Sequence, residues 1–300
     1  MFGIPNSENF IKTEPIDYGL SRAQKFYVET ADNRKLLLRL SDAADYSRKK
    51  ADYERMRKMD AAGIPMTRPI DFGLCGEGKN IYQLQTWCDG EMLEKMLPLL
   101  PKAEQYSLSV KAGEILRKIH SIPVDKTDTD GMNWYERYSD FIDESIKCFK
   151  ELNMPIEGSD LILDYFSANR RLLKERPQCY LHNDYHAANI ILSPAKELCV
   201  IDWEILLFNN YGDPWLDISM YASPDVSVGL IHGYFEGAPP PDFWRVFALY
   251  VSVGSLSSIP WAYYNFPGEL ESKKNNVGDA LRWFGNMKNP IPAWYTNAKK

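Results

Sequence analysis

Short apolar runs bounded by turn residues dominate the first 90 positions of the chain. Residues 25–30 (KFYVET), 35–40 (KLLLRL) and 81–87 (IYQLQTW) have the length and composition of β-strands. Residues 43–62, by contrast, are charged and contain no proline, which favours a helix. We therefore expect a small, strand-rich unit with one helix in this part of the chain.

The pattern becomes helical from about residue 90. Residues 103–120 repeat apolar positions at spacings of three and four, as on the buried face of a helix: Leu108, Ala112, Ile115, Leu116 and Ile119. A polar, irregular patch from 180 to 220 contains two short β-like runs, and helical patterns resume after 240. These patterns predict a two-lobed α+β fold, with a strand-rich lobe at residues 1–87 and a larger helical lobe at 88–300.

The composition argues against several classes of partner. A formal charge of -6 gives no electrostatic reason to expect nucleic acid or an anionic membrane, whereas a cationic ligand is easily accommodated. Residues 1–15 lack the basic start and apolar run of a signal peptide, and we find no run of about 18 apolar residues, so we expect a cytoplasmic protein. The cysteines are odd in number and form no CxxC, so we expect all of them to be reduced packing residues: Cys75, Cys88, Cys148, Cys179 and Cys199.

Two short motifs imitate nucleotide-binding signatures. Residues 73–80 (GLCGEGKN) nearly match a phosphate-binding loop, but Asn80 lacks the hydroxyl that should reach magnesium, and a strand follows where a helix is required. We interpret this segment as a hairpin turn. Asp71-Phe72-Gly73 spells a kinase metal motif, yet it precedes any candidate catalytic loop instead of following it.

The informative segment is LHNDYHAANIIL (181–192), followed by VIDWE (200–204). Phosphoryl transfer requires a carboxylate that orients the attacking hydroxyl and accepts its proton, together with oxygen ligands for magnesium. Asp184 stands five positions before Asn189, as in the catalytic-loop pattern HxDxxxxN, and Asp202 follows at the end of an apolar run. We predict that Asp184 is the catalytic base and that Asn189 and Asp202 hold magnesium.

Each of these residues also has an ordinary structural explanation. Asp184 and Asn189 are common in turns, and Asp202 could simply end a strand. The joint spacing favours the catalytic interpretation. His182 belongs to the same catalytic motif, although a buried hydrogen-bonding anchor is the favoured role for its side chain.

These motifs resemble the aminoglycoside phosphotransferase and choline kinase superfamily, which has a protein-kinase-like fold. The resemblance extends over nearly the whole chain, through GEILRKIHSIP (113–123) and NNYGDPWLDIS (209–219) to NPIPAWY (289–295). It implies a transfer of the terminal phosphate of ATP or GTP, with Mg²⁺, to a hydroxyl of a small molecule. It gives Asp184 the role of base, gives Asn189 and Asp202 the metal, and raises antibiotic resistance as a biological role.

The resemblance also assigns residues in the strand-rich lobe. Arg39 is expected to contact the nucleotide phosphates, with Lys35 as its rival. Glu54 is expected to pair with Arg39, although the same helix offers other carboxylates, among them Asp52. Gly19 stands where a phosphate-covering turn belongs, and backbone groups from Gln85 to Trp87 are expected to hold the adenine.

Carboxylates downstream of Asp202 suggest the charge of the acceptor. Glu204, Asp213 and Asp217 would make the mouth of the site acidic and attract a cationic acceptor such as an aminoglycoside. The alternative is that Asp213 and Asp217 only brace the catalytic loop.

Choline or ethanolamine is the second candidate for the acceptor. Aromatic faces bind quaternary amines, and the C-terminal half of the chain is rich in aromatic side chains: Trp261, Tyr263, Tyr264, Trp283, Trp294 and Tyr295. Most aromatic residues in a helical lobe nevertheless belong to the core.

Two other classes of protein remain as alternatives. A non-catalytic nucleotide-binding scaffold should lack one of the three polar residues of the loop and metal motifs, and all three are present. A protein kinase should show an Ala-Pro-Glu element after its metal motif, and this chain runs into GDPWLD (212–217) instead.

Overall fold

The computed structural model describes residues 3–17, 23–129, 131–204, 210–220, 224 and 226–297. Contacts divide the chain into two compact units, each described here by itself. The first contains Met1–Leu100 and His186–Ile205, and the second contains Pro101–Tyr185 and Leu206–Lys300. This division differs from the expected lobes at 1–87 and 88–300, because residues 186–205 pack with the N-terminal part of the chain.

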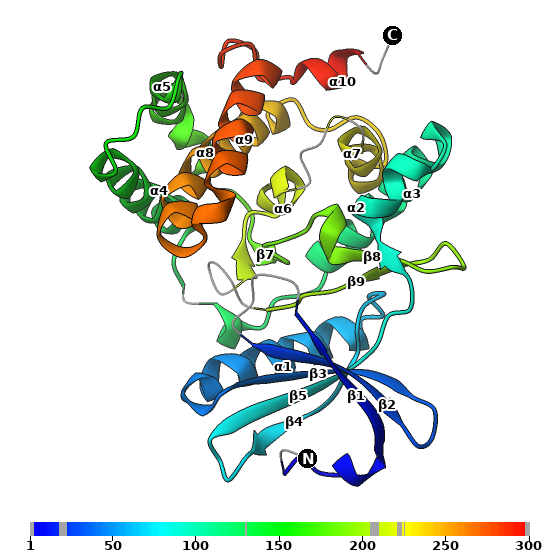
Figure 1. Ribbon diagram of the computed structural model, residues 1–300. Helices are drawn as coiled ribbons and strands as arrows, with labels where there is room; N and C mark the ends of the chain where they lie inside the picture. The colour runs from blue at the N-terminus through cyan, green and yellow to red at the C-terminus, as the bar shows by residue number, and fades with distance from the viewer. Residues whose placement is uncertain are drawn as a thin grey trace. The chain divides into compact units, whose positions relative to one another are not determined.

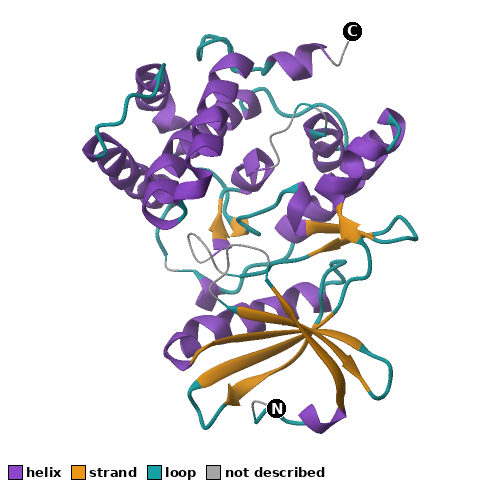
Figure 2. Ribbon diagram, viewed as in Figure 1, coloured by secondary structure: helices purple, strands orange, loops and turns teal. Residues whose placement is uncertain are grey.

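The first unit is built on a five-stranded antiparallel sheet with the strand order β1-β2-β3-β5-β4 (Figures 1 and 2). Its strands are β1 (Phe10–Ile16), β2 (Gln24–Thr30), β3 (Lys35–Asp42), β4 (Pro69–Cys75) and β5 (Asn80–Thr86), and α1 (Tyr46–Ala61) follows β3. The predicted strands and the predicted helix are therefore confirmed. The turn between β4 and β5 pairs Cys75 with Asn80, which confirms that the imitation phosphate loop is a hairpin turn.

Alternation along β3 separates an apolar face of the sheet from a polar one. Leu36, Leu38 and Leu40 enter a buried core that they share with residues of the neighbouring strands. Because successive side chains point to opposite faces, Arg39 lies on the other face, where it is 5% exposed. The sheet thus places a buried cation opposite its apolar core.

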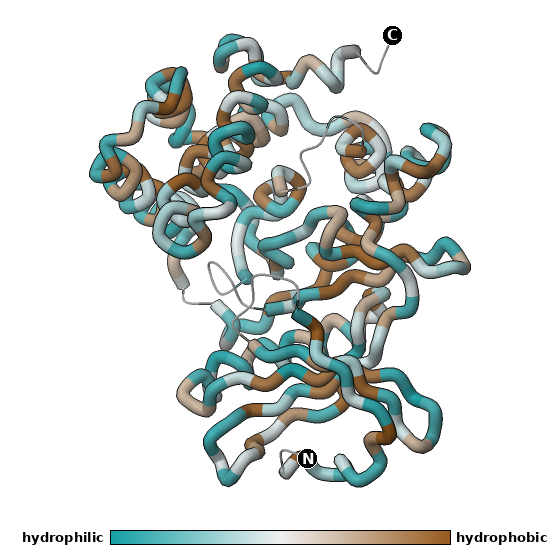
Figure 3. Tube along the Cα trace, in the orientation of Figure 1, coloured by the Kyte–Doolittle hydropathy of each residue, from teal (hydrophilic) through white to brown (hydrophobic). Residues whose placement is uncertain are grey.

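A second, three-stranded sheet explains why residues 186–205 belong to the first unit. It has the order β6-β8-β9 and consists of β6 (Glu91–Met92), β8 (Ile190–Leu192) and β9 (Leu198–Val200), with α2 (Leu93–Met96) packing beside β8. Val200 also donates its N–H to the carbonyl of Pro65 at 2.8 Å. The strands β8 and β9 are apolar and appear brown in Figure 3. The hairpin is thus fastened on two sides by residues of the N-terminal segment, through β6 and through Pro65.

The second unit is mainly helical. Its helices are α3 (Lys102–His120), α4 (Trp134–Glu151), α5 (Ser159–Asn169), α6 (Pro214–Met220), α7 (Ser227–Phe235), α8 (Phe243–Asn265), α9 (Leu270–Trp283) and α10 (Ala293–Asn297), and β7 (Cys179–Tyr180) pairs with β10 (Tyr211–Gly212). The helix predicted at 103–120 corresponds to α3. By length and composition α8 could cross a membrane, contrary to the expectation from the sequence, but 67% of its apolar window is buried against helices such as α5 and α9.

Glycines allow α3 and α7 to pack with their backbones in contact. A Cβ atom added to Gly113 would lie 2.1 Å from the carbonyl oxygen of Leu230, and one added to Gly233 would lie 2.0 Å from that of Val110. Neither oxygen belongs to a flexible side chain, so the helices would have to separate. This contact requires glycine at both positions.

We predict that Gly113→Ala lowers the free energy of unfolding by roughly 1–3 kcal/mol, because overpacking forces the two backbones apart. Gly254→Ala is the matched control, since this exposed position in α8 has nothing within 4 Å of an added Cβ. The control should be neutral or stabilising by up to about 1 kcal/mol. Urea denaturation followed by circular dichroism measures both values, and equal stability of the two variants would contradict the close contact between α3 and α7.

Candidate active site

The loop that carries Asp184 is held by one buried carboxylate of α6. Asp217 accepts hydrogen bonds from the backbone N–H of His182 at 2.7 Å and of Asn183 at 2.8 Å. Its Oδ2 also lies 3.1 Å from Nε2 of His120 on α3. Asp217 is fully buried, so it positions the two residues directly before Asp184.

Further contacts fasten the chain on both sides of Asp184. Asn183 has a φ of 65°, in the left-handed region, and its Nδ2 donates to Oδ1 of Asn210 at 2.9 Å. On the other side, the hydroxyl of Tyr185 donates to the carbonyl oxygen of Ala112 at 2.7 Å. Asp184 itself is half-buried. A carboxylate flanked by such fixed neighbours is suited to orienting a hydroxyl group.

Asp213 lies in a second buried network of the same unit. It accepts two hydrogen bonds from Arg176, at 2.6 and 2.9 Å, and one from the hydroxyl of Tyr250 at 2.7 Å. The guanidinium of Arg176 also stacks on the ring of Trp215, 3.4 Å from its centroid. The charge of Asp213 is therefore neutralised inside the protein.

The prediction that Asp213 and Asp217 bind the acceptor is wrong. Both side chains are completely buried and bonded to protein groups, so neither can present charge to a ligand. A direct catalytic role for His182 is contradicted for the same reason, because its ring is fully buried and packs edge-on against Tyr185. Asp217 positions the loop through its backbone N–H groups, His182 packs within the loop, and Asp213 holds Arg176 and Tyr250.

The two predicted metal ligands belong to the first unit, at the same end of the β8–β9 hairpin. Asn189 ends a short 3₁₀ helix (Ala187–Asn189) directly before β8, and its carbonyl accepts the N–H of Ile201 at 2.9 Å. Asp202 follows one residue later with a φ of 65°, a conformation that turns the chain out of the strand. Asp184 belongs to the other unit, and only five positions of sequence separate it from Asn189.

This donor set fits Mg²⁺. Magnesium is usually held by one or two carboxylates together with water and substrate phosphates, and an amide oxygen is an equally hard ligand. The hairpin offers one carboxylate, Asp202, whose side chain is 33% exposed, and one amide, Asn189. The NH₂ group of Asn189 lies 3.4 Å from Nε2 of His186, so a protein group faces the nitrogen end of the amide.

Arg39 stands at the centre of a charged cluster in the first unit. Its Nη1 donates to Oδ1 of Asp202 at 2.9 Å, and its Nη2 donates to Oε1 of Glu204. The same oxygen of Glu204 accepts a hydrogen bond from Lys49 Nζ at 2.8 Å. The carboxylate predicted to bind the metal and the cation predicted to bind phosphate are thus direct partners.

The protonation states in this cluster are set by burial and by neighbouring charges. Burial alone would raise the pKa of the Glu204 carboxyl, but the cations of Arg39 and Lys49 outweigh it and hold that pKa below its ordinary value. Burial would lower the pKa of Arg39, yet Glu204 and Asp202 raise it. Glu204 and Arg39 are therefore both charged at neutral pH.

Two predictions about this cluster are wrong. Glu204 does not offer charge to an acceptor, because two cations of its own unit already neutralise it. Glu54 does not pair with Arg39, because it lies on the solvent side of α1 and pairs with Arg57 at 3.5 Å. Asp52, on the buried side of α1, is the helix carboxylate whose charge acts on Arg39.

The rival assignment of Lys35 to the phosphates is not supported, whereas two cations that sequence reasoning missed join Arg39. Lys35 pairs with Asp89 at 2.7 Å in an exposed position. Lys25 is the cross-strand partner of Arg39, and burial followed by repulsion from Arg39 lowers its pKa. Lys49 lies on the buried face of α1. Strand register, which is invisible in the sequence, was needed to find Lys25.

Two backbone N–H groups at the end of β5 are already engaged within the protein. The N–H of Thr86 donates to the carbonyl of Arg68 at 2.9 Å, and that of Trp87 donates to the carbonyl of Lys35 at 3.0 Å. Gln85 is buried within the sheet and pairs with Leu37 on β3. An N–H that recognises adenine would therefore come from residues beyond Trp87. Gly19, the expected phosphate-covering glycine, lies outside the described residues.

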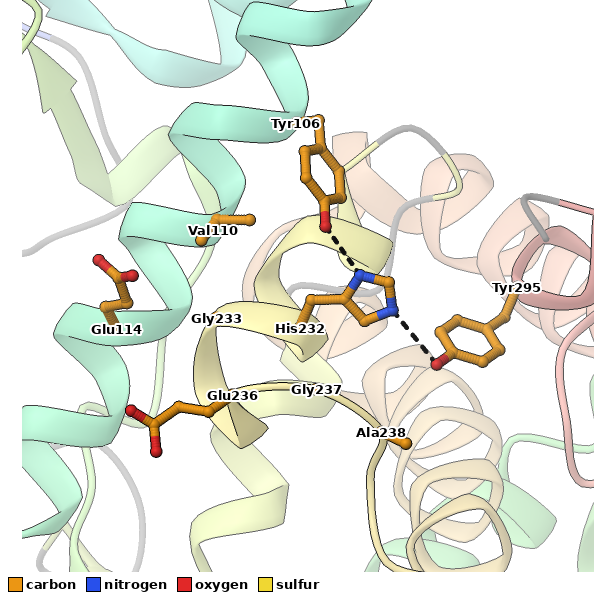
Figure 4. A pocket seen from close by; sticks show the side chains of 9 residues that line it. All are labelled: Tyr106, Val110, Glu114, His232, Gly233, Glu236, Gly237, Ala238 and Tyr295. Carbon is orange, nitrogen blue, oxygen red and sulfur yellow. Dashed lines mark hydrogen bonds between the residues drawn. The ribbon is translucent and has the colours of Figure 1, made fainter.

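A cavity of about 520 Å³ in the second unit contains none of these residues (Figure 4). It lies beside α3 and α7, and His232 stands in it between the hydroxyls of Tyr106 (2.9 Å) and Tyr295 (3.4 Å). Glu114 and Glu236 also line it. The catalytic assignment therefore depends on loop geometry and not on this cavity.

Comparison with known proteins identifies the family and the fold of the chain. The family model described as APH, phosphotransferase enzyme family, matches residues 12–250. No curated protein matches the chain in sequence. A thermostable mutant of aminoglycoside phosphotransferase APH(4)-Ia is similar in structure, with a TM-score of 0.66 and 16% identity over 94% of this chain and 97% of that chain.

Two other solved structures share the fold at equally low identity. ADP-bound aminoglycoside phosphotransferase APH(2'')-Ib has a TM-score of 0.63 and 15% identity, with 95% of each chain covered. Amicoumacin kinase hAmiN, in complex with AMP-PNP, Ca²⁺ and Ami, has a TM-score of 0.61 and 11% identity, covering 95% of this chain and 92% of that chain. The family model spans most of the chain, including the braced loop and the β8–β9 hairpin, so the chain belongs to the phosphotransferase enzyme family and is a phosphotransferase with an alcohol group as acceptor, built on a protein-kinase-like fold.

Proposed function

We propose that the protein is a cytoplasmic small-molecule kinase that moves the terminal phosphoryl group of ATP or GTP, with Mg²⁺, onto a hydroxyl of its acceptor. The observation that carries this proposal is the fixed loop around Asp184, with both preceding amides donating to Asp217. A scaffold that only bound nucleotide would need no such bracing of an acceptor-side carboxylate. A coupled nucleotide-turnover screen over aminoglycosides, macrolides, choline, ethanolamine, thiamine and amino sugars tests it, and absence of turnover with every acceptor would argue against it.

Asp184 performs the acid–base step in this proposal. Its carboxylate accepts a hydrogen bond from the acceptor hydroxyl, directs the oxygen lone pair toward the phosphorus, and takes the proton as the new P–O bond forms. The bond from phosphorus to the leaving oxygen of the nucleoside diphosphate breaks at the same time. Positioning supplies much of the rate, because phosphoryl transfer needs little covalent help from the protein.

Cations of the first unit serve the nucleotide. Arg39 presents a planar guanidinium that suits phosphate oxygens, and Lys49 and Lys25 add positive charge beside it. Asp202 and Glu204 hold Arg39 in place. Bound Mg²⁺, held by Asn189 and Asp202, would neutralise charge that develops on the phosphates.

A cationic antibiotic remains our proposal for the acceptor, supported by the solved relatives and no longer by acidic residues of this chain. One relative was solved with hygromycin B and another with streptomycin. The choline alternative loses part of its basis, because Trp294 and Tyr295 are buried in the core. Trp261 is exposed, but Lys273 already lies 5.6 Å from its ring centroid.

Asp184→Asn should lower kcat by roughly 10²–10⁴ while leaving nucleotide affinity nearly unchanged, because the amide cannot accept the proton. Steady-state kinetics and equilibrium binding of ADP measure the two quantities. Asp164→Asn, an exposed carboxylate on α5, is the control and should behave as wild type. Turnover of Asp184→Asn within a few-fold of wild type would remove the assignment.

Asp202→Ala should abolish the magnesium dependence of nucleotide binding, because it removes the only carboxylate predicted to bind the metal. Calorimetric titration with ADP in Mg²⁺ and in EDTA should show a large difference for wild type and none for the variant. Asn189→Ala should reduce the difference in part, since an amide is the weaker ligand. A wild-type magnesium response in Asp202→Ala would contradict the site.

Glu204→Gln should lower the free energy of unfolding by roughly 1–3 kcal/mol at neutral pH, because it removes the carboxylate that Arg39 and Lys49 share and leaves Asp202 and Asp52 as their remaining charged neighbours. The lowered pKa of Glu204 means that this contribution is present above 4.5 and is lost as the pH falls through the folded-state value, so wild type and variant should converge in acid. Urea denaturation at neutral pH and at a pH below the folded-state pKa of Glu204 measures the free energy of unfolding of both proteins. The control is Glu77→Gln, which changes an exposed carboxylate. KM for the acceptor should not change, and a selective rise in it would return Glu204 to the acceptor site.

A further inference from the structure

Two cysteines of the first unit that the sequence predicted to be reduced are joined to each other. Cys88 and Cys199 form a disulfide across 111 positions of sequence, with their Cα atoms 6.6 Å apart. That separation lies within the range in which disulfides form. Cys75, Cys148 and Cys179 are free thiols. Cys88 and Cys199 are therefore paired by the fold and not by their spacing in the chain.

Cys88 lies in the short segment that links β5 to β6. Both neighbours of Cys88 contact Lys35. Trp87 donates its N–H to the backbone carbonyl of Lys35, and the carboxylate of Asp89 pairs with the side-chain ammonium of Lys35. Gly90 then approaches β8 so closely that an added Cβ would lie 2.2 Å from the carbonyl oxygen of Leu192. The segment beyond Trp87 is also where a backbone contact to adenine would be made.

Cys199 is the central residue of β9, on the hairpin that carries the metal ligands. Val200, the next residue, donates its backbone N–H to the carbonyl of Pro65. Asp202 follows Cys199 by three positions. Cys199 pairs with Ile191 of β8, one residue beyond Ile190, which follows Asn189. A bond at Cys199 thus acts on the strand that positions Asp202.

The strand pairing that joins the β5–β6 region to the hairpin is short. The β6–β8 ladder contains only two residue pairs, Glu91 with Leu192 and Met92 with Ile191. A covalent bond beside such a short ladder restricts local opening strongly, because it removes open conformations that the ladder alone permits. Both cysteines are half-buried, and neither is among the fully buried residues of the core.

We propose that Cys88 and Cys199 are a reversible thiol–disulfide site that controls how firmly the β5–β6 segment is tied to the metal-binding hairpin. The effect on nucleotide binding rests on the function proposed above, whereas the chemistry of the site does not. The oxidised form holds the hairpin and the segment together and binds magnesium nucleotide more tightly. The reduced form opens locally and binds it more weakly.

The chemical step is an exchange with a low-molecular-weight disulfide such as oxidised glutathione. One cysteine loses its proton, and the thiolate attacks the glutathione disulfide, which releases one glutathione thiolate and leaves a mixed disulfide. The second cysteine, as thiolate, attacks the mixed disulfide and releases the other glutathione. Two protein thiols are oxidised, one glutathione disulfide is reduced to two thiols, and the two protons pass to the released glutathione.

The formation of the disulfide is tested by mass spectrometry of the intact protein. The protein is first equilibrated in glutathione buffers with an increasing share of oxidised glutathione, and its free thiols are then alkylated. Wild type should lose two alkylatable thiols together, and a non-reducing peptide map should show Cys88 linked to Cys199. Cys88→Ser and Cys199→Ser should each abolish this step, whereas Cys148→Ser, at a free cysteine outside the pair, should retain it. Five alkylatable thiols in wild type at every ratio, or a link between other cysteines, would overturn the proposal.

Thermal denaturation and ADP binding with Mg²⁺ test the consequence. Oxidised wild type should melt several degrees above reduced wild type and bind ADP at least about threefold more tightly, whereas Cys88→Ser should match the reduced form under both conditions. Equal melting of the two redox forms would overturn the proposal. If neither form bound nucleotide, the proposed kinase function would fail, while the mass and melting measurements would still decide the redox site.

Discussion

The buried carboxylate of Asp217 is the constraint on which the catalytic loop depends. It accepts two backbone N–H groups of the loop and lies within hydrogen-bonding distance of His120 on α3. A buried polar group is costly unless it is hydrogen-bonded, and these contacts give both oxygens of Asp217 a partner. The position of Asp184 follows from that of its two neighbours.

The first unit applies the same principle to cations. Arg39 is nearly inaccessible to solvent on the polar face of β3, where Asp202 and Glu204 compensate its charge and Lys49 shares Glu204 with it. The compensation holds the guanidinium in one orientation before any nucleotide arrives. Preorganised charge of this kind lowers the cost of reorganisation during phosphoryl transfer.

These networks change how the acidic residues near the motifs are interpreted. Glu204, Asp213 and Asp217 look in sequence like an attractive surface for a cationic acceptor, yet each is neutralised or enclosed by groups of its own unit. These three carboxylates therefore give no support to a cationic acceptor. Asp217 instead fixes the loop, and Glu204 fixes Arg39.

The sequence by itself determined the local features of this protein. Alternation in KLLLRL predicts a strand that places Arg39 opposite a leucine face, and the spacing of Asp184, Asn189 and Asp202 predicts the chemistry. Only the tertiary structure decided the partners: Lys25 beside Arg39, Asp52 in place of Glu54, Asp217 under the loop, and Cys88 joined to Cys199. The physical reason is that periodicity records which face of an element is buried, whereas strand register and contacts over a hundred residues depend on how separate elements pack.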